Sequence, residues 1–269
     1  MDEVLAVLVL YKCKLEDSSS FRTLNLSLKD FGGKLDVLVY DNSPISLYNE
    51  SDFYIGNIKV HYISDSLNPG VSKAYNVGAD YAYSKGKKWV LLLDQDTCFP
   101  INAIAIYADY IKEGSALGAP ILLSNDRCIS PCFFRCGRGK ALREYEIGMN
   151  EFRKISLLNS GLIIPLSLFT VSGGYNEKIA LDFSDHYFIE RLKKITSRYC
   201  LLEIECNHSL SASETDINKI LNRFGYYLKG AKEYSNWKFS IVAFLRTIKL
   251  TLKFRDVRFF RKYVKEYLK

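Results

Sequence analysis

Two carboxylates one residue apart, Asp94 and Asp96, directly follow the apolar run Val90–Leu93. A short run rich in Val and Leu predicts a buried parallel strand, and open α/β sheets bind ligands at the carboxyl ends of such strands. Two acids at that place need a counter-charge. Mg²⁺ or Mn²⁺, which bridges carboxylates to substrate phosphates, would supply one. The alternative is a strand that ends in a solvated acidic turn.

Apolar runs and polar segments alternate through the first half of the chain. Short runs rich in Val, Ile and Leu predict strands, and longer runs with apolar residues three to four positions apart predict helices. The order of these elements predicts an α/β fold, with a mainly parallel sheet covered by helices on both faces. The expected strands are 4–10, 35–40, 58–63 and 89–93, and the expected helices are 18–28, 71–84 and 102–113.

The second half of the chain is less regular. Residues 124–154 are rich in Cys, Gly and Arg with weak periodicity, which predicts an irregular hairpin or a loop beside the site. After it the apolar pattern returns and predicts further core elements, and two helices complete the chain. These elements are strands at 157–165 and 199–205 and helices at 183–194, 215–235 and 238–267.

The length of 269 residues allows one large α/β domain or two small ones. The chain starts with acidic residues, and the apolar run 4–11 is too short to span a membrane, so we expect a cytosolic protein without a signal peptide. Seven cysteines, an odd number, then favour reduced thiols. Cys128, Cys132 and Cys136 recur at a spacing of four, which indicates a loop or helix face; zinc is the alternative, although the usual paired spacing is missing.

The positive charge of the chain is concentrated at its C-terminal end. Residues 226–269 hold 12 Lys or Arg and 3 Asp or Glu, a net charge of +9, whereas residues 1–225 hold 25 and 27, a net charge of −2. A basic amphipathic helix suits an anionic membrane surface, and the alternative is a solvated helix packed on the core. No recognised nucleic-acid-binding module is present, so we expect no nucleic-acid partner. The apolar stripe of the last predicted helix is Phe239, Val242, Leu245, Ile248 and Leu252.

The order of the motifs along the chain resembles the inverting glycosyltransferases of family 2, which have the GT-A fold. The resemblance covers about residues 4–210 and rests on the joint order and spacing of the motifs. Asp-Gln-Asp at 94–96 is particularly similar to the bacterial rhamnosyltransferase branch, which builds O-antigens and other surface polysaccharides. The segments that carry the resemblance are 10–12, 39–43, 68–78, 93–96, 159–161, 173–177, 182–185 and His208.

The resemblance implies a nucleotide-sugar donor site at the strand ends. Asp41 would accept a hydrogen bond from the imide N–H of the base, unless it is simply a turn residue before Asn-Ser-Pro. Gly70 would let the backbone approach the donor, because glycine tolerates positive φ and has no side chain to clash. Lys73 would meet a phosphate or be merely exposed, and Asn76 would face the same cleft or serve as a cap. The whole donor set is Tyr11, Asp41, Asn68, Gly70, Lys73, Asn76, Asp94 and Gln95.

The same resemblance implies a divalent cation, Mg²⁺ or Mn²⁺, at the acidic motif. Asp96 would contact the ion directly, and Asp94 would contact the sugar, the ribose or the ion through water. His208 follows the last core strand and corresponds to the family's C-terminal histidine, which reaches the metal or the diphosphate; a structural histidine is the alternative. The metal set is therefore Asp94, Asp96 and His208, and the acceptor set is Asn159, Ser160 and Gly161.

A general base must remove a proton from the acceptor hydroxyl, and a carboxylate in a partly desolvated cleft can do so. Asp182 aligns with the acidic residue that precedes a helix in the rhamnosyltransferase branch. Many members have two adjacent acids here, but this chain has Phe183 as the second residue, so the base is either Asp182 or Asp185 and one of them caps the helix. Lys12 is another departure, since many members have Asn there.

These features together predict a metal-dependent inverting glycosyltransferase of O-antigen or capsule synthesis. We expect a GT-A domain at 1–212 and basic, membrane-proximal helices at 213–269. The expected donor is dTDP-rhamnose, with a UDP-hexose or UDP-N-acetylhexosamine as the alternative; from a different class, the alternative is a non-catalytic nucleotide-sugar binding module. The expected partners are a lipid-linked saccharide acceptor and the anionic inner face of the bacterial plasma membrane. A homo-oligomer is left open.

Overall fold

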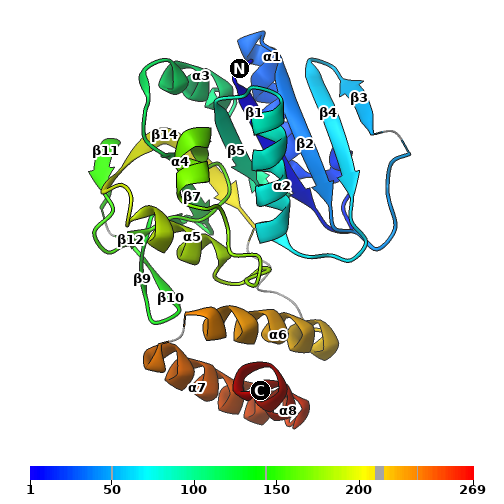
Figure 1. The fold of residues 1–269 in the computed structure, drawn as a ribbon, viewed down its shortest axis with the longest axis vertical. Coiled ribbons are helices and arrows are strands. Elements are labelled where there is room, and N and C mark those ends of the chain that lie inside the picture. Colours follow the sequence, from blue (N-terminus) through cyan, green and yellow to red (C-terminus); the bar gives the residue numbers. More distant parts are fainter. Residues whose placement is uncertain (50, 143, 210–214, 235) are drawn as a thin grey trace.

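The structure is a computed structural model, and it describes residues 1–49, 51–142, 144–209, 215–234 and 236–269. Figure 1 shows an α/β body and, beyond it, a layer of helices at the end of the molecule that holds the C-terminus. The strands are β1 (Val4–Leu10), β2 (Leu35–Asp41), β3 (Asp52–Ile55), β4 (Ile58–Ser64), β5 (Trp89–Leu93), β6 (Thr97–Cys98), β7 (Gly118–Ser124), β8 (Arg127–Ser130), β9 (Cys132–Arg135), β10 (Arg138–Ala141), β11 (Gly148–Glu151), β12 (Ile155–Ser156), β13 (Ile163–Pro165) and β14 (Arg198–His208). The helices are α1 (Ser19–Phe31), α2 (Val71–Ser84), α3 (Ala103–Glu113), α4 (Leu166–Val171), α5 (Ser184–Leu192), α6 (Ile217–Glu233), α7 (Trp237–Phe254) and α8 (Arg258–Tyr263), with a short 3₁₀ helix at Leu15–Asp17 and a π-helical turn at Val264–Leu268.

The main sheet has the strand order β11-β14-β7-β13-β5-β1-β2-β4-β3. Strands β5, β1, β2 and β4 are parallel neighbours, and so are β7 and β14. Strand β13 runs antiparallel to both of its neighbours, and the edge strands β3 and β11 are antiparallel as well. The predicted α/β fold with a mainly parallel sheet is confirmed, and parallel strands place their carboxyl ends at one edge.

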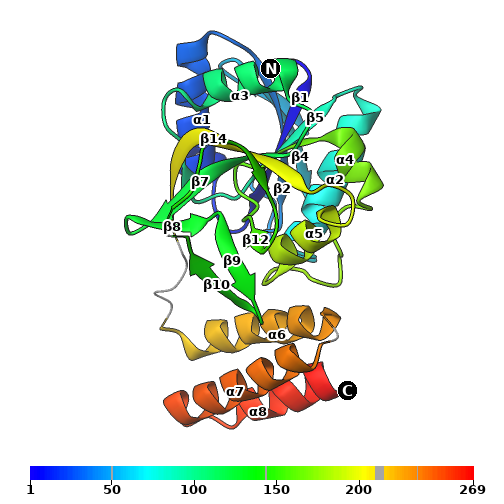
Figure 2. The ribbon, with the colours of Figure 1, turned by 90° about the vertical axis from the view of Figure 1, so that its left-hand side faces the viewer.

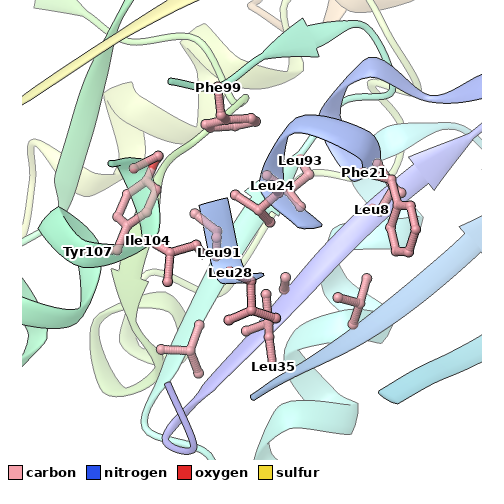
Figure 3. Packing of buried hydrophobic residues seen from close by; sticks show 14 of the residues in the cluster. Leu8, Phe21, Leu24, Leu28, Leu35, Leu91, Leu93, Phe99, Ile104 and Tyr107 are labelled. Carbon is pink, nitrogen blue, oxygen red and sulfur yellow. The ribbon is translucent and has the colours of Figure 1, made fainter. Parts of the chain in front are cut away.

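The side chains of β1 alternate between two apolar cores, because successive residues of a strand point to opposite faces. Leu8 belongs to the core that α1 and α3 cover, whereas Val7 belongs to the core that α2, α4 and α5 cover. Every residue of β1 is buried, as a strand covered on both faces requires. Burial of each such aliphatic side chain stabilises the fold by about 1.5–3 kcal/mol. Figure 3 shows the first core, where Leu8, Leu91 and Leu93 of the sheet meet Leu24 and Leu28 of α1 and Ile104 and Tyr107 of α3.

Local signals in the sequence set the bounds of α1. Ser18 caps its start, since its side chain accepts a hydrogen bond from the backbone N–H of Phe21. Gly32 ends it in the left-handed conformation, with φ of 77°. Helix α2 occupies 71–84, the predicted range, and Gly70 precedes it with φ of 97°.

The region at 124–154, predicted to be an irregular hairpin or a loop, contains short strands. Strand β8 extends the main sheet at β7, and β9 pairs with β10 and β12 in a small separate sheet. Phe134 of β9 stacks on the ring of His186 in α5, with ring centroids 3.7 Å apart. The hairpin is therefore packed against α5 and is continuous with the rest of the protein.

The helices α6, α7 and α8 share a third apolar core, which includes Phe224, Phe239 and Phe259. Ile179 and Phe183, from the segment before α5, are part of the same core. Figures 1 and 2 show these three helices as a layer beyond the sheet. The predicted C-terminal helices are thus present, and they are packed on the α/β body.

The prediction of one helix over 238–267 is wrong, because the chain turns between α7 and α8. Arg255 takes a left-handed conformation with φ of 50°. Asp256 then accepts a hydrogen bond of 2.9 Å from the backbone N–H of Arg258 and starts the next helix. A helix needs successive right-handed residues, so one left-handed residue ends it.

The strand predicted at 157–165 is also shorter than expected. Only Ile163–Pro165 forms a strand, because residues 159–161 make a turn in which Gly161 has φ of 82°. Strands β3 and β7 were not predicted; β7 begins with Gly and Pro, which usually indicate a turn. The predicted domain boundary at 212/213 lies outside the described residues. None of the helices in the described part of the chain combines the length and the apolar character needed to cross a bilayer.

Gly78 lets α2 approach the sheet, because a Cβ at this position would lie 2.4 Å from Cγ2 of Val7 in β1. Gly78→Ala is expected to lower the free energy of unfolding by about 1–3 kcal/mol, as overpacked cores do, although Ala is the better helix former. Urea denaturation followed by circular dichroism measures this. The matched control is Asp80→Ala on the exposed side of α2, expected within about 0.5 kcal/mol of the parent. Unchanged stability of Gly78→Ala would contradict the packing argument.

Candidate active site

The acidic motif occupies the turn between β5 and β6, at the carboxyl edge of the parallel strands. Strand β6 pairs with the end of β14, and this pairing sets Thr97 opposite His208. The Thr97 hydroxyl lies 2.8 Å from Nδ1 of His208, and that same nitrogen is 3.6 Å from Oδ1 of Asp96. The structure therefore brings the predicted metal set together, from positions that are more than 100 residues apart in the chain.

A buried network of hydroxyl groups supports this turn from behind. The Thr97 hydroxyl is 2.8 Å from the hydroxyl of Ser160, which accepts a hydrogen bond of 3.2 Å from the backbone N–H of Asp94. Ser20 of α1 accepts a hydrogen bond from the backbone N–H of Thr97 and donates one to the carbonyl oxygen of Asp94. These contacts fix the turn before any ligand binds.

Asp94 is the acid with the most strongly perturbed environment at the site. The Tyr75 hydroxyl donates a hydrogen bond of 2.7 Å to its Oδ1. Burial raises the pKa of Asp94 from its usual 3.8 to about 6, and the negative charge of Asp96 adds to this shift. Burial also raises the pKa of Asp96, while the positive charges of His208 and Arg223 oppose the rise. The edge of the sheet thus holds two carboxylates that lack enough positive charge.

This donor set suits a hard divalent cation. Carboxylate oxygens with one imidazole nitrogen are ligands for Mg²⁺ or Mn²⁺, and Mg²⁺ is usually bound by one or two carboxylates together with substrate phosphates. Within the described residues, no group of three or more His, Cys, Asp or Glu side chains is arranged to hold a metal by itself. Asp94 and Asp96 therefore fit an ion that takes its remaining ligands from a bound diphosphate.

Gln95 connects the acidic turn to the end of β1. Its side-chain oxygen accepts a hydrogen bond of 2.9 Å from the backbone N–H of Tyr11, whose own side chain is exposed. A pocket of about 410 Å³ lies just beyond the ends of β1 and β2. It is lined by Lys12, Cys13, Lys14, Asp17, Ser43, Pro44, Ile45 and Leu47.

Asp41 does not face this pocket, contrary to its predicted contact with the base. Its side chain is fully buried, with one oxygen accepting from the Tyr62 hydroxyl at 2.5 Å and the other from the backbone N–H of Ser43 at 2.8 Å. Asp41 therefore positions Ser43 and the pocket wall. This arrangement favours the alternative interpretation, in which Asp41 is a turn residue.

The motif at 68–78 binds the segment before α5 in the structure. A Cβ on Gly70 would lie 2.1 Å from the carbonyl oxygen of Ala180, so glycine is needed here for contact with protein backbone. The Asn76 side chain accepts from the N–H of Tyr175 and donates to its carbonyl oxygen, at 2.8 and 3.0 Å. Gly70 and Asn76 therefore hold the segment before α5, and their predicted approach to the donor stays a prediction.

The two remaining members of that motif also have partners within the protein. Lys73 forms an ion pair with Glu177, with Nζ 3.4 Å from Oε2 and both side chains well exposed. Asn68 takes a left-handed conformation with φ of 49°, and its backbone N–H donates to the carbonyl oxygen of Asp65. Lys73 is accessible to a phosphate, whereas Asn68 shapes the turn.

Asn159, Ser160 and Gly161, the predicted acceptor set, are buried beneath the acidic turn. Asn159 accepts a hydrogen bond of 2.6 Å from the Tyr175 hydroxyl, and the carbonyl oxygen of Gly161 accepts one of 2.8 Å from Tyr107. Ser160 is fully buried within the hydroxyl network. The motif therefore supports the acids from below, and burial keeps it from an acceptor.

Asp182 and Asp185 have different surroundings, which separates the two alternatives for the base. Asp182 lies 3.7 Å from Nε of Arg223 in α6, and burial raises its pKa while Arg223 and Arg246 oppose the rise. Asp185 lies in the first turn of α5, close enough to Asp94 for its charge to raise the pKa of that acid. The charge of Asp185 thus acts on Asp94, while Arg223, the partner of Asp182, acts on Asp96.

Sequence reasoning missed three residues of the site: Tyr75, Thr97 and Arg223. Tyr75 and Thr97 stand beside recognised motif residues, but a hydroxyl carries no signal until its partner is known. Arg223 lies in the helix predicted at 215–235, outside the basic segment 226–269, and its charge reaches both Asp182 and Asp96 because α6 passes beside the site. The cysteine triplet lies apart from the acidic motif, in β8, in β9 and in the turn after β9.

Comparison with known proteins gives one family. Residues 23–126, which contain the acidic motif, match the model of Glycosyl transferase family 2. No curated protein sequence matches the chain.

Solved structures resemble the chain at low identity. "Crystal structure of S. aureus TarS" is 16% identical with a TM-score of 0.49 over 87% of this chain, which spans 40% of that one. A197 from STIV is 13% identical with a TM-score of 0.43, over 77% of this chain and 86% of that one. The inositol-1-phosphate CTP transferase from T. maritima is 10% identical with a TM-score of 0.47, over 80% and 92%.

Removal of the Asp94 charge is expected to stabilise the metal-free protein. A buried acid whose pKa rises from 3.8 to about 6 costs stability that grows as the pH increases between these values. In the presence of a chelator, Asp94→Asn should therefore match the parent near pH 4 and exceed its free energy of unfolding by up to about 3 kcal/mol above pH 7. Denaturation at several pH values measures this, with Asp80→Asn on exposed α2 as the control. A less stable Asp94→Asn protein at pH 7.5 would contradict the argument that the ionised Asp94 carboxylate lowers the free energy of unfolding.

Proposed function

We propose that this protein is an inverting glycosyltransferase that moves a sugar from a nucleotide-sugar donor to an acceptor hydroxyl. The observation that carries the proposal is the meeting of Asp94, Asp96 and His208 at the sheet edge, with Asp185 close enough for its charge to act on Asp94. The match of residues 23–126 to Glycosyl transferase family 2 supports it independently. Glycosyl transfer needs a site for a diphosphate and a base on the other side of the sugar.

The donor site of this proposal lies along the carboxyl ends of β1, β2 and β5. The pocket beyond β1 and β2 has a volume of about 410 Å³, within the range of small-molecule sites, and would hold the nucleotide. Lys12 and Lys14 line it and suit an anionic ligand. The diphosphate would then lie at Asp94 and Asp96, held through Mg²⁺ or Mn²⁺ with His208 beside it. A bound cation stabilises the negative charge of the departing nucleoside diphosphate.

Asp185 is the base in this proposal. Its carboxylate takes the proton of the acceptor hydroxyl as the hydroxyl oxygen bonds to the anomeric carbon. The bond between that carbon and the phosphate oxygen breaks at the same time, and the electron pair leaves with the nucleoside diphosphate. One displacement inverts the anomeric configuration. In this proposal Asp182, paired with Arg223, holds α6 beside the site.

The finer features of the proposal are a rhamnose donor and a lipid-linked acceptor. The Asp-Gln-Asp motif favours dTDP-rhamnose, and a UDP-hexose or UDP-N-acetylhexosamine is the alternative. The +9 charge of residues 226–269 supports work on a lipid-linked saccharide at the inner face of a bacterial plasma membrane, in O-antigen or capsule synthesis. A non-catalytic nucleotide-sugar binding module would bind the donor at the same site but would not transfer its sugar.

Incubation with candidate donors identifies the donor and distinguishes a glycosyltransferase from a non-catalytic binding module. With Mn²⁺, the matching nucleotide sugar is expected to raise the melting temperature and to release nucleoside diphosphate slowly by hydrolysis, because water replaces a missing acceptor. The panel contains dTDP-rhamnose, UDP-glucose and UDP-N-acetylglucosamine, each with Mn²⁺ or with EDTA. Asp96→Ala is the control and should abolish metal-dependent release. Binding without release from any donor or with any acceptor extract would favour the binding module, and no donor binding at all would contradict both.

Substitution of each acid separates the base from its neighbour. Asp185→Asn is expected to lower turnover about 10²–10⁴-fold, the usual contribution of a general base, and to keep the donor-induced thermal shift. Asp182→Asn is the matched control three residues away, and it should retain turnover within about tenfold because the pair of Asp182 with Arg223 lies outside the proposed proton transfer. Kinetics and melting curves on both proteins measure this. The reverse pattern would assign the base to Asp182.

A further inference from the structure

Helix α7 exposes a continuous apolar stripe on one face. Its members are spaced four, three, one, three and four residues apart, which places them along one side of an α-helix over about 22 Å. The exposed fractions are 67% for Trp237, 48% for Ile241, 43% for Phe244, 56% for Leu245 and 72% for Leu252, and Ile248 is half-buried.

The opposite face of α7 holds the helix on the protein. Phe239, Ala243 and Thr247 are buried there, and Phe239 packs face to face on Tyr234 with centroids 4.2 Å apart. Within the stripe, Phe244 lies 5.9 Å from the ring of Tyr263 in α8 and Ile248 is half-buried, whereas Trp237, Ile241, Leu245 and Leu252 are largely exposed. The stripe predicted from the sequence mixed the two faces, since its member Phe239 is buried and its members Leu245 and Leu252 are exposed.

The charges around the stripe indicate what covers it. Lys249 and Lys253 of α7 and Arg255 after it are exposed, and Lys238 lies over the ring of Trp237 at 5.6 Å. An apolar face bordered by cations matches an anionic bilayer, in which apolar side chains enter the acyl boundary and Lys or Arg meet the headgroups. A bound nucleic acid would leave the apolar face exposed to water. An apolar groove of another protein would leave the Lys and Arg side chains without anionic partners.

We propose that the exposed stripe of α7 docks on an anionic bilayer, with the helix lying in the plane of the interface. Figures 1 and 2 show α7, with α8 beside it, at the end of the molecule farthest from the N-terminal part of the sheet. The proposal depends on the proposed function in one respect: docking would give the enzyme access to a lipid-linked acceptor. Docking itself requires no catalysis.

The chain carries its own probe for this contact. It has two tryptophans: Trp89, buried at 5% exposure, and Trp237, exposed at the start of the stripe. Vesicles of phosphatidylcholine with phosphatidylglycerol should shift the Trp237 emission to the blue, and lipids brominated near the headgroup end of the acyl chain should quench it. Vesicles of phosphatidylcholine alone should do so about tenfold more weakly, because the cations of the segment have no anionic partner there.

A triple substitution tests the surface itself. Ile241→Ser with Leu245→Ser and Leu252→Ser is expected to lower partitioning to anionic vesicles at least about tenfold, because three apolar side chains no longer enter the bilayer. The matched control removes similar exposed apolar side chains elsewhere, Leu26→Ser with Tyr54→Ser and Tyr83→Ser, and should bind as the parent does. Co-sedimentation measures binding, and circular dichroism checks that both proteins fold. Should the triple variant not fold, Lys238→Gln with Lys249→Gln and Lys253→Gln provides the second test, with the same expected loss.

Two results would overturn the proposal. One is an unchanged Trp237 spectrum and no co-sedimentation with anionic vesicles at low salt. The other is equal binding by the parent and the folded triple variant. If sedimentation analysis instead shows a dimer that the triple substitution dissociates, a second copy of the chain covers the stripe. Nucleoside diphosphate release is measured without vesicles, so failure of the proposed reaction and failure of docking are separate outcomes.

Discussion

The accumulation of negative charge at the end of β5 is the constraint on which the rest of the site depends. Asp94 and Asp96 lie at an edge where burial disfavours their ionised forms, as the raised pKa of both shows. The Tyr75 hydroxyl donates a hydrogen bond to the Asp94 side chain, and the backbone N–H of Asp94 donates one to Ser160. Nearby positive charge offsets the negative charge of the two acids only in part. A cation bound between these carboxylates would relieve a repulsion that folding has already imposed.

Several elements of the fold hold that turn in place. Strand β14 returns beside β6 and places His208 against Thr97, and the antiparallel strand β13 allows the turn before it to pass under the acids. The contacts of Gly70 and Asn76 then fix the segment at 173–182, which leads to α5 and Asp185. Gly70 and Asn76 thus make contacts within the protein that position the segment before Asp185.

The C-terminal helices are joined to the site by the same segment. Phe183 takes a left-handed conformation with φ of 75° and packs into the core of α6–α8. Its neighbour Asp182 pairs with Arg223 of α6. One short segment therefore connects the layer that carries the exposed stripe of α7 to the helix that carries Asp185. A surface contact at α7 would hold the active site at a fixed height above that surface.

The sequence by itself determined the elements of the parallel half of the sheet and the place of the acids. The runs that form β1, β2, β4 and β5 are short and apolar, and α2 has clear helical spacing, so local pattern was enough. Strand β13 was too long in the prediction and β7 was absent from it, because Gly and Pro in those runs have a meaning that depends on neighbouring strands.

Tertiary structure decided the roles of the polar residues and the orientation of α7. A hydroxyl such as Ser160, or an amide such as Asn76, acts through whichever partner folding brings to it, and here those partners are 66 and 99 residues away along the chain. The sequence offers two carboxylates, before and within α5, and tertiary structure gives Asp182 an ion pair with Arg223. Likewise, the apolar residues of α7 surround more than one face, and the packing of Phe239 and Ala243 decided which face remained exposed.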